Sequence, residues 1–235
     1  MVITGRAYPR YADYLPMAWA VFYSASGGPN YFFGNEITVI QRDPGARAEA
    51  SAFYVGGGTV GGEFFRNRIT SNVPAVWAAS PYGGARQVLF RDNTFIRAAS
   101  APEGWKPVRM GWMPRKDCVA TEIEFRSNHV EGAPFEVDMT DQPHSYTVRW
   151  TLDMALKDAD GKALTDKEVV ITDRSGQESF RGRVDSRGTL QAELTEYVFS
   201  DGKRQYASPY TVFCEGVRRK VELKDNMAVS LVLKR

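Results

Sequence analysis

The amino-acid sequence predicts an all-β protein with two domains: a stack of parallel strands over residues 1–142 and an antiparallel β-sandwich over residues 146–235. Three observations lead to this prediction. A Phe-x-x-Asn-x-apolar motif recurs through the first part of the chain, and apolar and polar residues alternate around it. The last part consists of short alternating runs separated by turns rich in Asp and Gly, which is typical of small all-β domains.

The recurring motif sets the period of the first domain. Its asparagines are separated by 32, 26 and 35 residues, and a period of this size is typical of stacked supersecondary units. Alternation around the motif predicts a strand with one buried face. We expect each asparagine to end its strand in left-handed backbone and to share hydrogen bonds with its counterparts as a ladder. The copies are centred on Asn35, Asn67, Asn93 and Asn128.

A second segment in each repeat predicts a second stacked strand. Apolar side chains mostly occupy the first, third and fifth positions after a proline, so we expect these positions to face inward. The tryptophans there are interpreted as core residues rather than as ligand contacts. The segments cover residues 16–21, 51–56, 74–79, 107–112 and 134–139, and only 51–56 lacks the proline.

The repeated motif resembles that of the right-handed parallel β-helix family, the fold of pectate-lyase-like proteins. The resemblance covers residues 1–142 and implies a β-helix of about 4–5 coils. Polysaccharide-cleaving members of this family commonly place carboxylates and basic groups on outer faces of the helix, so the resemblance also implies a carbohydrate partner. Met1 aligns with the turn asparagine of the later coils. We therefore expect the chain to be the C-terminal portion of a longer β-helix, truncated at its N-terminus.

From residue 146 onward the pattern becomes that of a β-sandwich. Residues 146–156 alternate between apolar and polar side chains, and short strands follow between turns. This segment resembles the transthyretin-like or carboxypeptidase-regulatory-like class of small sandwiches. Asp158, Asp160 and Gly161 are interpreted as a hairpin turn, because their spacing does not match an EF-hand calcium loop.

Composition excludes several classes of function. The net charge of +2 comes from 30 basic and 28 acidic side chains, without the basic excess expected of a nucleic-acid-binding protein. No apolar stretch is long enough for a membrane span, and the N-terminus lacks the pattern of a signal peptide. The few cysteines and histidines predict neither a metal site nor a cofactor. Cys118 and Cys214 are interpreted as buried free thiols, and His129 as a surface residue.

The second strands of the last two coils carry the polar cluster best placed for chemistry. Arg109 and Glu136 hold equivalent positions after Pro107 and Pro134, and Asp138 follows on the same face. Because neighbouring strands lie about 4.8 Å apart, we expect Arg109 to contact Glu136. Carboxylates can act as acid, base or nucleophile in sugar cleavage, and a cation can neutralise a uronate. Arg109, Glu136 and Asp138 are therefore the candidate catalytic residues, with an exposed salt bridge as the alternative.

Long loops between coils supply the candidate binding residues. Long and short loops alternate along the first domain, so we expect the long loops on one side. They carry aromatic and cationic side chains, which suit acidic sugars because rings pack against apolar sugar faces and Arg binds carboxylates. The alternative is that the rings clamp the loops onto the coils. The candidate substrate-binding residues are Tyr11, Tyr14, Arg42, Arg47, Trp105 and Lys106.

Two classes of function remain open. The first is a carbohydrate-active enzyme, a polysaccharide lyase or glycoside hydrolase of which this chain is a fragment. The second is a non-catalytic surface adhesin or structural module. The expected partner is a polysaccharide or oligosaccharide, and we expect the parent protein to be secreted or at the cell surface. The sequence leaves both catalysis and the oligomeric state open.

Overall fold

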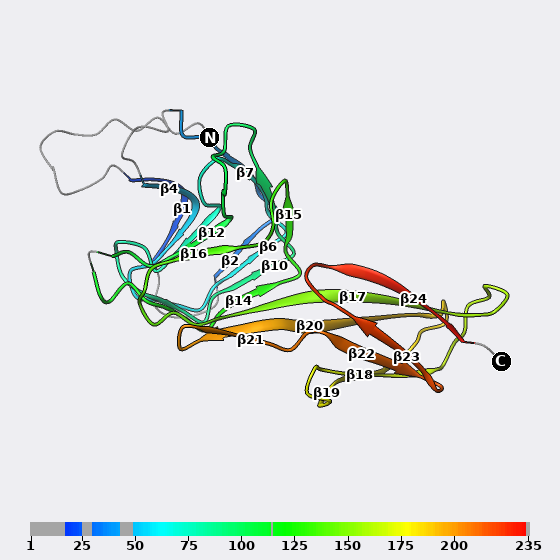
Figure 1. Ribbon diagram of the computed structural model, residues 1–235. Helices are drawn as coiled ribbons and strands as arrows, with labels where there is room; N and C mark the ends of the chain where they lie inside the picture. The colour runs from blue at the N-terminus through cyan, green and yellow to red at the C-terminus, as the bar shows by residue number, and fades with distance from the viewer. Residues whose placement is uncertain (1–16, 25–29, 43–48, 114, 234–235) are drawn as a thin grey trace, which may run out of the picture. The chain divides into compact units, whose positions relative to one another are not determined.

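The computed structural model describes residues 17–24, 30–42, 49–113 and 115–233 (Figure 1). These residues form strands, turns and loops without an α-helix, so the prediction of an all-β protein is confirmed for them. The chain divides into two compact units. The first unit comprises Met1–Glu124, Asn128–Tyr146 and Ser200–Gly202, and the second comprises Phe125–Ser127, Thr147–Phe199 and Lys203–Arg235.

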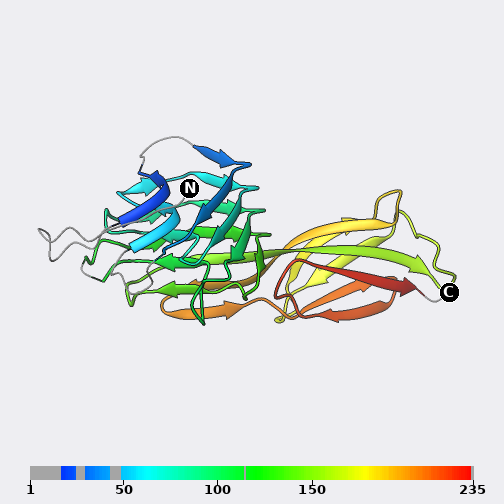
Figure 2. The same cartoon turned by 90° about the horizontal axis from the view of Figure 1, so that it is seen from above.

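One sheet of the first unit consists of parallel strands that follow one another in chain order, one from each repeat (Figure 2). The row of paired residues Phe53, Val76, Val108 and Val137 is buried and faces the core. The strands of this sheet are β1 (Met17–Tyr23), β4 (Glu49–Val55), β8 (Val76–Ala78), β12 (Val108–Met110) and β16 (Val137–Met139).

The motif strands pair in parallel in the same way, so each repeat contributes one strand to each set. One set contains β2 (Tyr31–Phe33), β6 (Glu63–Phe65) and β10 (Leu89–Arg91). The corresponding motif strand of the last repeat is β14 (Ile123–Arg126). A second contains β3 (Glu36–Val39), β7 (Arg68–Ser71), β11 (Thr94–Arg97) and β15 (His129–Glu131). A short third contains β5 (Thr59–Val60), β9 (Ala85–Arg86) and β13 (Ala120–Thr121).

The core of the first unit contains a stack of phenylalanines from the motif. Phe64 is fully buried, and its ring stacks on Phe32 at a centroid distance of 4.8 Å and on Phe90 at 4.9 Å. Stacking arises because the motif places the same residue at the same register position in successive repeats. The period of the sequence thus becomes a continuous column of apolar contacts across the repeats.

The asparagine ladder predicted from the motif is present. The Nδ2 of Asn35 donates to Asn67 Oδ1 at 2.8 Å, that of Asn67 donates to Asn93 Oδ1 at 2.9 Å, and that of Asn93 donates to Asn128 Oδ1 at 2.9 Å. Asn67, Asn93 and Asn128 are buried, at 1% exposure or less. Each buried amide also donates to the carbonyl of a motif phenylalanine in the preceding repeat, so the polar groups of the turn are satisfied without water.

The left-handed residue in each of these turns is not the asparagine, which corrects that expectation. Gly34, Arg66, Asp92 and Ser127, each immediately before a ladder asparagine, have φ angles between +48° and +66°. The asparagine amide is needed for contacts with two neighbouring repeats, so the sharp bend falls one residue earlier.

The second unit contains two sheets. In one, β17 (Tyr146–Asp158) neighbours β24 (Met227–Leu233) and β20 (Thr189–Ser200), and β20 neighbours β21 (Lys203–Tyr206). Alternate residues of β17 are buried, as its sequence pattern predicted. The other sheet is antiparallel and contains β19 (Glu178–Arg183), β18 (Glu168–Thr172), β22 (Tyr210–Cys214) and β23 (Val217–Val221) in that order.

The pair of β17 and β24 is parallel, which corrects the expectation of a wholly antiparallel second domain. The strand β24 follows β23, which belongs to the other sheet, so no hairpin forces it to run against β17. Cys118 and Cys214 are both buried and free, as predicted.

Candidate functional site

The first sheet has an outer face, opposite the buried row that includes Phe53 and Val76. Successive residues of a strand point to opposite faces, so the residue after each member of the buried row belongs to this outer face. These residues are again in register from one strand to the next. We call them the outer row: Phe22, Tyr54, Trp77, Arg109 and Asp138.

Cationic and aromatic side chains are in contact along the outer row. The guanidinium carbon of Arg109 lies 4.2 Å from the centroid of the Trp77 ring, within cation–π distance. Trp77 is buried, and its Nε1 donates to Gly111 O at 3.0 Å, which fixes the ring. Lys106 Nζ lies 3.7 Å from Asp138 Oδ1, with both side chains partly exposed. Arg109 of the row and Lys106 beside Asp138 thus bring two cations and one carboxylate together with an immobile indole.

The register of the sheet corrects the expected contact between Arg109 and Glu136. Arg109 pairs with Asp138, whereas Glu136 is exposed and precedes β16. Proline proves to be a poor register marker, because the buried valines Val76, Val108 and Val137 follow it by two, one and three residues. Apolar side chains that fill the core set the register. For the same reason Trp77, predicted to face inward, belongs to the outer row by register, and it is fully buried, as predicted of a core residue.

The predicted loop residues do not form one cluster. Trp105 is only 6% exposed, and its Nε1 donates to Val73 O at 2.8 Å. Its indole therefore clamps the loop, as the alternative interpretation expected. Lys106 joins Asp138 at the outer row, and Arg42 is exposed beyond the end of β3. Tyr11, Tyr14 and Arg47 lie outside the described residues.

An aromatic cluster at the β1 side of the outer row was missed by sequence reasoning. The ring of Tyr82 lies 5.2 Å from Phe22, 6.0 Å from Tyr54 and 6.2 Å from Trp19, measured between centroids. Tyr54 in turn contacts Trp77 at 5.1 Å. Phe22 and Tyr82 are 38% and 49% exposed, so two rings of this cluster are accessible to a ligand. Tyr82 belongs to a turn outside the repeated motif, and no local pattern links it to β1.

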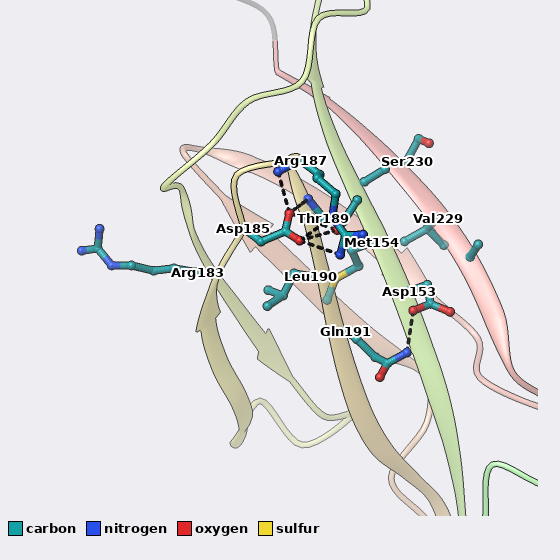
Figure 3. A pocket seen from close by; sticks show the side chains of 12 residues that line it. Asp153, Met154, Arg183, Asp185, Arg187, Thr189, Leu190, Gln191, Val229 and Ser230 are labelled. Carbon is teal, nitrogen blue, oxygen red and sulfur yellow. Dashed lines mark hydrogen bonds and ion pairs between the residues drawn. The ribbon is translucent and has the colours of Figure 1, made fainter. Parts of the chain in front are cut away.

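The larger pocket of the second unit has a volume of about 700 Å³ (Figure 3). Its polar groups largely satisfy one another: Gln191 Nε2 donates to Asp153 Oδ1 at 2.9 Å, and Asp185 accepts from Arg187 and Thr189. The hydrogen bond from the Thr189 backbone, helped by Arg187, lowers the pKa of Asp185 to about 2. Asp185 therefore holds its own turn together.

The turn at Asp158 is a hairpin turn, as predicted. Its Oδ1 accepts from the backbone N–H groups of Asp160 at 3.0 Å and Lys162 at 2.9 Å. Within the part of the chain that the structure describes, no group of three or more His, Cys, Asp or Glu side chains could hold a metal ion. The same described residues include no helix long and apolar enough to cross a membrane.

The two histidines have opposite surroundings. His129 is exposed, as predicted, and His144 is 1% exposed. His144 Nδ1 accepts from Ala120 N at 3.0 Å, and its Nε2 lies 2.9 Å from Thr140 Oγ1. Burial lowers the pKa of His144, so the neutral ring with its proton on Nε2 fits both contacts. This histidine joins Thr140 to Ala120 of β13, and it lies outside the outer row.

No protein-family model and no curated protein matches the sequence. Among solved structures, the major pilin subunit BcpA of Bacillus cereus is similar at 14% identity, covering 37% of this chain and 28% of that chain with a TM-score of 0.29. The Bacillus anthracis TIE protein is similar at 16% identity, covering 43% of this chain and 18% of that chain with a TM-score of 0.30. Similarity this low leaves the function to be inferred from the site.

Proposed function

We propose that this chain is a non-catalytic carbohydrate-binding protein, and that the outer row with its aromatic cluster binds an acidic polysaccharide. We further propose that the first unit is a right-handed parallel β-helix and the second a β-sandwich. Parallel pairing of successive repeats in chain order supports the first assignment, and the two sheets of the second unit support the second. A secreted or cell-surface parent protein fits such a partner.

The observation that carries the proposal is the position of Arg109 between an indole and an acidic side chain. Arg109 stacks on Trp77 and is in register with Asp138, and Lys106 lies beside Asp138. Two cations against one carboxylate leave a net positive charge, which a uronate carboxylate can neutralise. The guanidinium fork is suited to a carboxylate, and stacking reduces the freedom that Arg109 loses on binding.

The exposed rings of Phe22 and Tyr82 supply the second half of a sugar site. Carbohydrate rings have apolar faces, and aromatic side chains with one accessible face bind them by contact area. The aromatic cluster lies on the same sheet as Arg109 and is joined to it through Tyr54 and Trp77. A chain of acidic sugars can therefore place rings on the aromatic cluster and a carboxylate on the cations.

Binding without cleavage is favoured over an enzyme by the surroundings of the two carboxylates. Asp138 has 58% of its side chain exposed and lies near Lys106, and Glu136 is exposed outside the strand. A general acid for sugar cleavage is usually held in an enclosed environment that keeps its proton. Neither Glu136 nor Asp138 has such an enclosure.

Affinity for a polyuronate tests this proposal. We expect polygalacturonate to bind the intact chain more tightly than neutral dextran, and Arg109→Ala to weaken binding at least tenfold. Arg109→Lys should restore only part of the affinity, because it keeps the charge and loses the fork. Arg68→Ala is the matched control, since Arg68 is an ion-paired strand residue of another sheet in the same unit.

Equal affinity of the Arg109→Ala and Arg68→Ala variants would contradict the proposal. The same samples test for an enzyme, by the appearance of new reducing ends or unsaturated uronates. Product formation that Glu136→Ala or Asp138→Ala abolishes would replace the binding proposal with the lyase or hydrolase alternative.

A further inference from the structure

A second, smaller pocket in the second unit lies outside both the outer row and the larger pocket. Its volume is about 340 Å³, which falls within the range of roughly 300–1,000 Å³ typical of small-molecule sites. Four parts of the unit meet there: the end of β21, the middle of β20, and the segments after β18 and β23. Its lining residues are Arg174, Glu196, Tyr206, Ser208, Glu222, Leu223 and Lys224.

Glu196 is the most constrained polar group of this pocket. Its Oε2 accepts a hydrogen bond from the Nε1 of buried Trp150 at 2.6 Å, which fixes the carboxyl group. Among the described residues its Oε1 has no hydrogen-bond partner. Burial raises the pKa of Glu196, against the opposing effects of the Trp150 bond and of nearby Arg204 and Lys224. One carboxyl oxygen is thus held in position and left available to a ligand.

Donors and an aromatic face complete the lining. Ser208 Oγ accepts from Leu223 N at 2.9 Å, so its hydroxyl hydrogen stays available to donate. The guanidinium of Arg174 is exposed, and within the described residues it forms no ion pair. Tyr206 is 41% exposed, and its ring is supported by Tyr197 at a centroid distance of 5.3 Å.

The charges of the pocket balance. Lys224 and Glu222 form an ion pair at 3.0 Å, which leaves Arg174 and Glu196 as the other two charged groups of the lining. An ionic ligand gains little net attraction from such a lining. A neutral ligand with several hydroxyl groups can instead donate to the carboxyl oxygen and accept from the guanidinium and the serine hydroxyl.

We propose that this pocket binds the ring of a neutral sugar, with Glu196 and Arg174 bonding its hydroxyl groups and Tyr206 packing against its apolar face. This site is separate from the proposed function, because it lies in the other unit and prefers an uncharged ligand. The chain then has two carbohydrate sites that differ in the charge of the sugar they accept.

Ligand-observed NMR titration of the full chain with methyl β-D-glucopyranoside and methyl β-D-galactopyranoside tests the proposal, with free galacturonate as the charged comparison. We expect a dissociation constant of about 1 mM for at least one neutral glycoside, which corresponds to about 4 kcal/mol of binding free energy. Galacturonate should bind this pocket at least fivefold more weakly. Arg174→Ala and Glu196→Gln should each weaken binding of the neutral glycoside at least fivefold.

Arg187→Ala is the matched control, because Arg187 is an exposed turn arginine that lines the larger pocket. If this variant loses the sugar while Arg174→Ala keeps it, the site is the larger pocket and the proposal is wrong. Absence of binding by both neutral glycosides also overturns it. Thermal melting checks that Glu196→Gln is folded, and exposed Arg174 provides a variant that does not disturb the core. Arg109→Ala should leave neutral-sugar binding unchanged, so this proposal and the polyuronate proposal can fail independently.

Discussion

The two units build their turns with different side chains. In the first unit, asparagine amides bond residues of neighbouring repeats, 26 to 35 positions away. In the second unit, aspartate carboxylates bond the backbone of their own turn, two and four positions ahead: Asp158, Asp173 and Asp185.

This difference follows from burial. A neutral amide can be enclosed when all its donors and acceptors are satisfied, whereas an unpaired buried charge is too costly. Asn93 is therefore completely buried, while Asp173 and Asp185 keep contact with solvent. Asp158 is buried at 7% exposure, and its carboxylate accepts from two backbone N–H groups of its own turn. The ladder makes each repeat depend on the next one, as expected of a repeat architecture, and the aspartates stabilise single turns. Loss of one side chain should spread through the first unit and stay local in the second.

The largest expected effect is that of Asn93→Ala. The substitution removes the acceptor for the backbone and side-chain N–H groups of Asn67. It also removes the side-chain donor to Phe64 O and one of the two donors to Asn128 Oδ1, which keeps the backbone N–H of residue 93. Unsatisfied buried groups cost about 1–3 kcal/mol each, so we expect a loss of about 4 kcal/mol in unfolding free energy. Urea denaturation measures it.

Asn35→Ala is the matched control for the ladder. Asn35 occupies the same place in the motif, but it is exposed and bonds to one neighbour. We expect about 1 kcal/mol for this variant. Equal costs at both positions would show that the ladder does not couple the repeats, and the contrast between the units would then be wrong.

The ladder was predictable because it depends on recurrence alone. An asparagine at the same place in successive repeats must meet its counterparts once the strands stack, whatever the loops do. The buried alternation of β17 was predictable for a similar reason, since a strand with one buried face alternates along its own sequence. Both features need only short-range pattern and a period.

The candidate site was harder to predict because it depends on register. Arg109 meets Asp138 rather than Glu136 since Val108 and Val137 fill the same core layer, and the loop lengths before them differ. The contact of Tyr82 with Phe22 joins a turn to a strand sixty positions earlier, with no repeated motif between them. Sequence pattern located the sheet and its charged residues, and side-chain packing decided which of them touch.

A second prediction compares two glycines with almost the same backbone. Gly111 in the first unit and Gly176 in the second have φ angles of +85° and +87°. A Cβ at Gly111 would overlap Thr140 Oγ1 and lie 2.6 Å from His144 Nε2, whereas a Cβ at Gly176 has nothing within 4 Å. We expect about 3 kcal/mol of destabilisation for Gly111→Ala and about 1 kcal/mol for Gly176→Ala.

Thermal melting of the two variants separates the effect of backbone strain from that of space. The strain is common to both, so the difference between them reports the packing around Gly111. A smaller loss for Gly111→Ala than for Gly176→Ala would mean that the polar group of Thr140 and His144 moves aside freely. That result would contradict a rigid interface between repeats.

The smallest effect is expected from pH, and it should separate the two units. Burial lowers the pKa of His144 below its ordinary value of 6.5, against the opposing effects of the Ala120 hydrogen bond and of Asp141. Its contribution is therefore complete above pH 6.5 and is lost as the pH falls below that value. The pKa of Asp185 is lowered from 3.8 to about 2, so its contribution is complete above pH 3.8 and is lost between pH 3.8 and about 2.

Hydrogen exchange of peptides from each unit, compared between about pH 7.5 and about pH 5, measures this difference, after correction for the intrinsic exchange rate. We expect the first unit to lose protection in this range and the second to keep it. His144→Gln should remove much of the pH dependence of the first unit, while His129→Gln, at the exposed histidine, should leave it unchanged. Protonated His144 has no lone pair on Nδ1 for the N–H of Ala120, so acid breaks the bond between β13 and the segment before β17. If both units lose protection equally in the absence of His144, the pH response arises from general charge repulsion rather than from this buried ring.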